Sequence, residues 1–209
     1  MSDFPADMPP SLFERADESP DGLFYDFPRL VTHVDDITIE TLRAYYGETL
    51  SPGSTVLDLM SSWISHLPEN LALSDTLGLG MNATELAENA QLSEFVVHDL
   101  NAEPELPFAS ERFDAVLNAF SIQYLTQPIA VMRSVNRILK PGGRSIVAMS
   151  HRCFPTKAIR GFQYIDGPER MRLVARYHEQ AGNFSAINEV DRSPPHGDPL
   201  WIVTATKRH

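Results

Sequence analysis

Short apolar runs alternate with amphipathic stretches along this chain of 209 residues. Residues 55–59 contain no turn former and follow Pro52-Gly53, which predicts a buried parallel strand. Residues 36–50 carry apolar side chains at helical spacing, and Asp36 can cap that helix. The same reading predicts strands at 77–81, 95–98, 113–118 and 145–149, and helices at 83–91, 128–139 and 168–181.

Two further strands, 184–190 and 200–206, end the chain and are joined by a short helix-free segment. A parallel return would need a longer crossover, so these two strands must be antiparallel. The sequence therefore predicts an α/β fold, with a doubly wound, mostly parallel seven-stranded sheet and an antiparallel C-terminal hairpin.

The segment between the first two strands has an ambiguous pattern. Trp63, Ile64, Leu67 and Leu71 have helical spacing, but Pro68 interrupts them. An interior proline costs a helix about 3 kcal/mol. We therefore expect a short or broken helix in this segment.

The domain boundaries follow from composition. Residues 1–20 carry four prolines among acidic residues, which predicts a mobile N-terminal arm. Residues 21–209 suit a single domain, and we expect residues 150–182 to form a cap on its substrate side.

Charge and cysteine content narrow the class of protein. The net charge of −11 disfavours nucleic acid as a substrate. No apolar run approaches the roughly 20 residues that span a bilayer, and residues 1–10 do not resemble a secretory signal. The one cysteine, Cys153, excludes an intrachain disulfide. We expect a cytoplasmic protein without a membrane partner, and the oligomeric state stays open.

Ligands of doubly wound sheets bind outside the carboxyl ends of the strands. Asp58, Met60 and Asn82 follow the first two strands and are expected to face one crevice, and Asp99 closes the third strand. A glycine-rich turn is expected after the first strand, yet no glycine occurs between Gly53 and Gly78.

Five motifs occur in order between residues 56 and 149. They are Val56-Leu57-Asp58-Leu59, Leu79-Gly80-Met81-Asn82, Val97-His98-Asp99-Leu100, Leu106-Pro107-Phe108 with Arg112-Phe113-Asp114-Ala115-Val116, and Arg137-Ile138-Leu139-Lys140-Pro141-Gly142-Gly143. Together they resemble the class I S-adenosylmethionine-dependent methyltransferase family, of the type 11 group. The family fold ends in a reversed strand, in agreement with the hairpin.

The resemblance implies S-adenosyl-L-methionine as cofactor and assigns roles to the crevice residues. The loop after Asp58 would approach the methionine portion, Asn82 the ribose, Asp99 and Leu100 the adenine, and the end of the fourth strand the methyl donor. The implied cofactor-binding residues are Asp58, Met60, Ser61, Ser62, Asn82, Asp99, Leu100, Asn118 and Phe120. Asp58 could instead cap its turn, and asparagine is also a strong helix N-cap at position 82.

Three residues at two places depart from the family pattern. Ser61 and Ser62 replace glycines, and Asn82 replaces an acid. A serine in a left-handed turn would cost roughly 1–2 kcal/mol, and the amide would lose about 1–2 kcal/mol of ribose bonding.

A catalytic base is needed only if the acceptor must lose a proton. His151 and His33 are the candidates, with a surface or hydrogen-bonded histidine as the alternative for each. Cys153 could be a nucleophile or a small apolar filler. The seven histidines show no metal-ligand spacing, so no metal is expected.

The leading hypothesis is methyl transfer from S-adenosyl-L-methionine to a small-molecule acceptor. The alternative is a non-catalytic binding or regulatory module that keeps the fold. A nicotinamide-dependent oxidoreductase fits less well, because the three-glycine fingerprint is missing.

Overall fold

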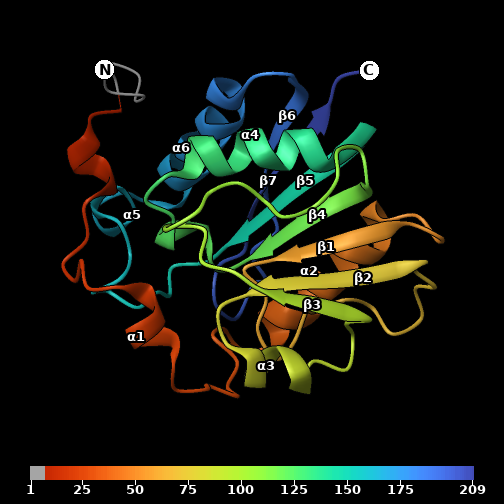
Figure 1. The fold of residues 1–209 in the computed structure, drawn as a ribbon, viewed down its shortest axis with the longest axis horizontal. Helices are drawn as coiled ribbons and strands as arrows, with labels where there is room; N and C mark the ends of the chain where they lie inside the picture. Colours follow the sequence, from red (N-terminus) through yellow and green to blue (C-terminus); the bar gives the residue numbers. More distant parts are fainter. Residues whose placement is uncertain (1–7) are drawn as a thin grey trace.

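A computed structural model describes residues 8–209 (Figure 1). Seven strands form one sheet in the order β3-β2-β1-β4-β5-β7-β6. Strand β7 pairs antiparallel with both β5 and β6, and the pairs among the first five strands are parallel. The strands are β1 (Thr55–Leu59), β2 (Asp75–Gly80), β3 (Glu94–Val97), β4 (Phe113–Ala119), β5 (Leu139–Met149), β6 (Phe184–Asp191) and β7 (Trp201–Lys207). The predicted fold class is confirmed.

Helices cover both faces of the sheet (Figure 1). On one face α4 (Pro128–Ile138) and α6 (Gly167–Ala181) pack on alternate strand residues such as Leu57 and Val116. On the other face α2 (Asp36–Thr49) packs on Val56 and its neighbours. The remaining helices are short: α1 (Asp21–Tyr25), α3 (Ala83–Glu88), α5 (Arg160–Gln163) and the 3₁₀ turns η1 (Pro10–Phe13) and η2 (Ile122–Tyr124).

Strand β5 begins earlier than the sequence predicts. Leu139 was expected to end a helix, and the Lys-Pro-Gly-Gly stretch to form a turn. Instead Leu139 already pairs with Phe113, and the register shifts before Arg144 pairs with Ala115. Gly142, at φ +76°, permits this bulge, because most other residues are strained at positive φ.

The segment between β1 and β2 contains no helix, so the expected short or broken helix is wrong. Side chains from beyond β2 bond its backbone instead. Gln91 accepts hydrogen bonds from the amides of Ser65 and Leu67 at 3.3 and 3.4 Å, and donates to the Leu67 carbonyl at 2.8 Å. Asn89 donates to the Ser65 hydroxyl at 2.9 Å. These bonds replace the internal bonds that a helix would have made.

Residues 8–20, the described part of the expected arm, pack against the domain. Met8 and Phe13 are buried in the core on the α4–α6 face. The Asp17 amide also donates to the Thr156 carbonyl at 2.9 Å. Packing therefore does not change at residue 20, where the sequence suggested a boundary.

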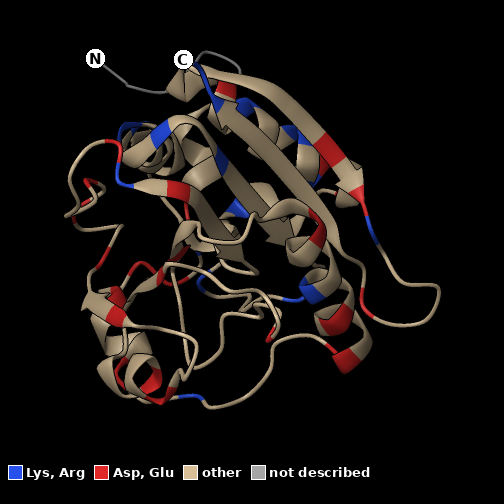
Figure 2. Cartoon of the chain, turned by 90° about the vertical axis from the view of Figure 1, so that its right-hand side faces the viewer, with Lys and Arg blue, Asp and Glu red and all other residues tan. Residues whose placement is uncertain are grey.

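Acidic and basic residues are both spread over the described part of the chain, residues 8–209. Figure 2 shows acidic residues on several loops and helices, with basic residues scattered among them. Across residues 8–209, no helix combines the length and the apolar character needed to span a bilayer.

Candidate functional site

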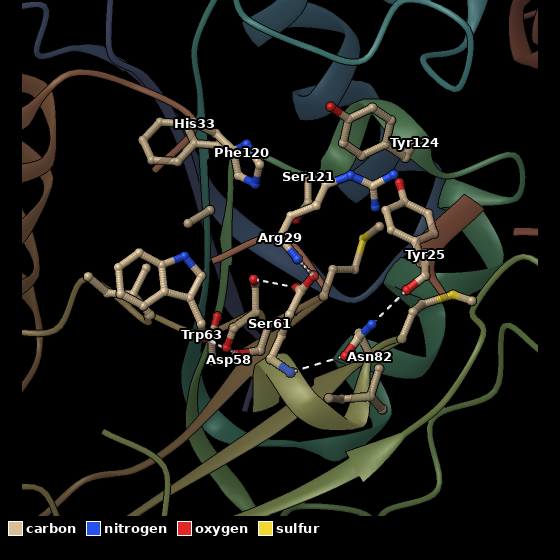
Figure 3. Close-up of a pocket in the computed structure, with 18 of the residues that line it drawn as sticks. Tyr25, Arg29, His33, Asp58, Ser61, Trp63, Asn82, Phe120, Ser121 and Tyr124 are labelled. Atoms are coloured by element: carbon tan, nitrogen blue, oxygen red, sulfur yellow. Dashed lines mark hydrogen bonds between the residues drawn. The ribbon is translucent and has the colours of Figure 1, made fainter. Parts of the chain in front are cut away.

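A cavity lies at the carboxyl ends of β1, β2 and β4 (Figure 3). It brings together most of the residues named from the sequence: Asp58, Met60, Ser61, Ser62, Asn82, Asp99, Leu100, Phe120 and His33. Asn118 is buried beside it and donates to the Leu59 carbonyl at 3.2 Å. His151 is exposed outside the cavity, 3.7 Å from Asp198. The structure therefore does not bring His151 to the site.

Asp58 is a buried carboxyl group, with 3% of its surface exposed. Its Oδ2 accepts hydrogen bonds from Ser61 Oγ at 2.5 Å and Ser65 Oγ at 2.7 Å. Burial raises the pKa of Asp58 to about 6, although both hydrogen bonds act in the opposite direction. Asp58 thus fixes the shape of the first loop through its serines.

The first turn does not strain its serines. Met60 takes the left-handed conformation, at φ +61°, while Ser61 and Ser62 do not. The prediction that the serines take the left-handed conformation is therefore wrong. Met60 takes it instead and carries the free-energy cost. The glycine that permits close approach lies on β2, because a Cβ at Gly80 would come within 2.2 Å of the Ser61 carbonyl oxygen.

Asn82 uses all of its side-chain hydrogen-bonding groups within the protein. Its oxygen caps α3 by accepting from the amides of Thr84 and Glu85. Its amide nitrogen donates to the carbonyls of Tyr25 at 2.8 Å and Asp26 at 3.1 Å. The N-cap role is thus real, and residues 25–26 occupy the groups expected to bind a ribose.

Asp99 keeps one oxygen available. Its Oδ1 accepts from the amides of Asn101 and Ala102, at 2.9 and 3.3 Å, which shapes the turn after β3. Among residues 8–209 no hydrogen bond reaches its Oδ2. Leu100 is buried beside it and lines the cavity.

An N-terminal segment, residues 21–33, covers the cavity, and no local sequence pattern marks its anchors. Glu85 accepts from the Arg29 amide at 2.7 Å and from the Ser62 hydroxyl at 2.6 Å. Trp63 donates its indole N–H to the Val31 carbonyl at 3.0 Å. This covering segment therefore closes one side of the site (Figure 3).

Aromatic side chains hold the same segment from the other side. The Arg29 guanidinium lies 4.5 Å from the ring centroid of Phe24 and 5.4 Å from that of Phe154. Phe154 stacks on Tyr124, with ring centroids 5.9 Å apart. Phe154 belongs to residues 150–182, the expected cap, so part of that cap does reach the cavity.

A buried ionic cluster anchors the start of the covering segment. Asp21 accepts a hydrogen bond from Arg15 at 2.7 Å and from Asn101 at 2.7 Å, and Lys157 Nζ lies 3.1 Å away. Burial acts to raise the pKa of Asp21, but the bonds from these three partners outweigh it and lower the pKa. Asn101 follows Asp99 closely, so the cluster also steadies the loop beside Asp99.

Three residues with left-handed backbone surround the cavity: Met60, His66 and Phe120, at φ between 56° and 61°. Each costs about 1–2 kcal/mol in a non-glycine residue, and such strain concentrates at functional sites. His66 was not predicted as a site residue, because nothing in its local sequence pattern marks it.

Comparison with known proteins agrees with this architecture. Residues 64–147 match the family model described as a methyltransferase domain, of type 11. The resemblance to class I S-adenosylmethionine-dependent methyltransferases is confirmed. A ubiquinone/menaquinone biosynthesis C-methyltransferase from Shewanella oneidensis is 33% identical over 108 residues, which cover 46% of this chain and 42% of that protein. The match thus spans less than half the length of this curated relative.

Solved structures share the methyltransferase fold at low sequence identity. One is a Haloferax volcanii methyltransferase complex with the Trm112 activator, with a TM-score of 0.63, 17% identity, and coverage of 83% of this chain and 92% of that chain. Another is a Haemonchus contortus phosphoethanolamine N-methyltransferase in complex with S-adenosyl-L-methionine, with a TM-score of 0.59, 14% identity, and coverage of 83% and 53%. The family match and this complex support the predicted cofactor.

The cavity fits the adenosine end of S-adenosyl-L-methionine in part. Asp99 Oδ2 is available to accept from an amino group, and Leu100 supplies an apolar wall. At the ribose position Asn82 is saturated by residues 25–26. A ribose would have to displace these two bonds, each worth about 0.5–1.5 kcal/mol net. Binding is therefore expected to move the covering segment.

Proposed function

We propose that this domain transfers a methyl group from S-adenosyl-L-methionine to a small-molecule acceptor. The observation that carries the proposal is the cavity at the carboxyl ends of β1, β2 and β4, lined by Asp58, Asp99 and Phe120. The methyltransferase family match supports the reaction type. The covering segment closes one side of the cavity, which favours a small acceptor over a macromolecule.

The residues of the chain act mainly by positioning. Asp99 Oδ2 would accept from the adenine amino group, and Leu100 would pack beside the ring. The aromatic faces of Tyr25 and Phe120 line the cavity and suit a sulfonium cation. When bound, the cofactor supplies an electrophilic methyl group on such a cation. Transfer is then an in-line displacement, for which orientation accounts for much of the rate.

Calorimetric titration with S-adenosylhomocysteine tests the proposal. We expect saturable binding, which an Asp99→Ala substitution weakens by about tenfold through the lost adenine contact. An Asp75→Ala substitution at the distant start of β2 serves as the matched control and should leave the affinity unchanged. No binding at millimolar S-adenosylhomocysteine would reject the function.

One observation favours a second candidate, a non-catalytic binding or regulatory module. Asn82 is saturated by the covering segment, whereas an acid at this position could accept from the ribose directly. Mass spectrometry separates the two functions. Conversion of S-adenosyl-L-methionine to S-adenosylhomocysteine with a broad acceptor panel supports transfer, and binding without conversion supports the module.

A further inference from the structure

His66 is a buried imidazole beside the cavity. It lies in the irregular segment after β1, lines the cavity and has 7% of its surface exposed. Its ring centroid lies 5.8 Å from that of Phe120, with the two planes at 73°. Phe120 follows β4, the strand end that the family resemblance assigns to the methyl donor. The ring is therefore close to where an acceptor must sit.

A comparison with His178 shows that His66 is not a satisfied core histidine. Both ring nitrogens of His178 are bonded, to the Val174 carbonyl at 2.9 Å and Ser145 Oγ at 3.0 Å. Nδ1 of His66 is enclosed and has no hydrogen-bond partner among residues 8–209. Nε2 is not among the enclosed unpartnered atoms of that range, and no hydrogen bond within it reaches this nitrogen. We therefore infer that the ring meets the cavity through Nε2.

The surroundings keep His66 neutral. Burial lowers its pKa to about 4, and the charge of Arg43 on α2 and the electrostatic effect of His33 in the covering segment act in the same direction. A neutral imidazole holds a free lone pair over the whole physiological pH range. His33, by contrast, is exposed and stacks edge-on against Phe154.

Aromatic side chains also line the cavity, beside polar ones such as Asp58 and Asn82. The aromatic side chains that line it are Tyr25, Trp63, Phe120, Tyr124 and Phe154. Aromatic rings pack well against one another in offset or edge-to-face arrangements. These rings suit a planar aromatic molecule.

We propose that His66 is the catalytic base for a small aromatic acceptor that carries an ionisable O–H group. This inference rests on the proposed methyl transfer and names the acceptor class and the proton acceptor of the same site. From the sequence alone, His33 and His151 were the candidates for this role. His66 replaces them because His33 is exposed, His151 lies outside the cavity, and neither ring nitrogen of His66 has a hydrogen-bond partner among residues 8–209.

The proton balance of the step is simple. The acceptor oxygen uses a lone pair to bond the methyl carbon, while the electrons of the broken carbon–sulfur bond remain on sulfur. The O–H bond breaks and its proton moves to Nε2 of His66, which becomes an imidazolium and then releases the proton to water. A weak base suffices, because an oxygen that is gaining a methyl group becomes strongly acidic.

Kinetics with 1-naphthol and catechol as acceptors test the assignment. Wild-type kcat/KM should be flat between pH 7 and 8, because this range lies above the pKa of His66 and above that of Asp58, which lines the same cavity. His66→Asn keeps a residue that tolerates the left-handed backbone but removes the base. We expect a loss of about 10²-fold or more at pH 7, and a variant rate that rises tenfold per pH unit because only ionised acceptor reacts. His196→Asn, in an exposed loop, is the matched control and should follow the wild type.

A binding measurement gives a readout apart from activity. With S-adenosylhomocysteine present, saturating 1-naphthol should shift the imidazole nitrogen signals of His66 in NMR spectra of the wild-type protein, and leave those of His196 unchanged. No shift at His66, or a His66→Asn pH profile parallel to the wild type, overturns the assignment. If S-adenosylhomocysteine itself does not bind, the proposed function fails. If it binds and transfer persists with an unchanged pH profile, only the role of His66 fails.

Discussion

Lys157 Nζ lies 3.1 Å from Asp21 Oδ1, and the two side chains come from segments 136 positions apart, 157 minus 21. Lys157 has no exposed surface, and Asp21 is also buried. Lys157 further donates to the Ser19 carbonyl at 2.7 Å and lies 3.2 Å from Asp17. This pair ties the start of the covering segment to the expected cap.

Breaking that pair should be costly. Lys157→Met leaves the Asp21 and Asp17 carboxylates without their shared cation, and removal of one partner from a buried pair costs about 3–5 kcal/mol. We expect a lower free energy of unfolding in urea and faster amide hydrogen exchange in residues 17–26. Arg160→Met is the control, because the Arg160–Glu14 pair is more than half exposed and is worth about 1 kcal/mol or less. Equal losses for both variants would contradict the anchoring role.

Asp58→Asn should stabilise the protein at neutral pH. The pKa of Asp58 is raised from 3.8 to about 6 in the folded state, so burial disfavours the charged form. Asp58 makes its full contribution to the free energy of unfolding below about pH 4, where it is protonated. This contribution is lost as the pH rises through 6 and the buried group ionises. The amide removes that cost, so we expect a gain of about 1–3 kcal/mol at pH 7 that shrinks as the pH falls towards 4. Urea unfolding at both pH values checks this, and a gain independent of pH would argue against it.

Asn82→Asp should favour cofactor binding. The carboxylate still caps α3 but cannot donate to the Tyr25 and Asp26 carbonyls. Loss of these bonds removes the competition for the ribose position and adds a charged acceptor. We expect S-adenosylhomocysteine to bind about tenfold tighter by calorimetry, with faster exchange of the amides near residue 25. Unchanged or weaker binding would show that residues 25–26 do not compete with the ligand.

Gly80→Ala should disrupt the first loop. The added Cβ would meet the Ser61 carbonyl at 2.2 Å, and backbone cannot move aside cheaply. We expect a loss of about 1–3 kcal/mol in unfolding free energy and at least tenfold weaker S-adenosylhomocysteine binding. Gly78→Ala on the same strand is the matched control, because its Cβ meets only the flexible end of Leu92. That variant should retain the affinity, and similar affinity losses in both would refute the close-approach argument.

Local pattern was enough to predict the sheet. The strands before residue 120 are short and apolar, and the helix at 128–138 has a clear apolar face, so neighbouring residues alone define these elements. The reversed β7 followed from the short connection before it. Because strand ends converge at one edge, the same pattern also grouped Asp58, Asn82 and Asp99.

The expected helix after β1 failed for a non-local reason. Its residues have helical spacing, but Gln91 and Asn89, more than twenty positions further on, donate to the carbonyls of Leu67 and Ser62 and hold the backbone in an irregular conformation. No local window contains both partners. The left-handed backbone at Met60, in place of the serines, also has a non-local origin. Gly80 on β2 lies close to the Ser61 carbonyl, and this contact fixes the turn.

The sequence by itself determined the order of strands and helices and the edge of the sheet where a ligand binds, because these depend on periodicity and connection length. Only the tertiary structure decided which side chains are free to act there. In the folded protein the carbonyls of residues 25–26 accept the hydrogen bonds of Asn82, and Lys157 is buried beside Asp21. His151 lies outside the cavity, whereas His66 is buried beside it. Such choices depend on hydrogen bonds and burial between segments far apart in the chain, which no local pattern encodes.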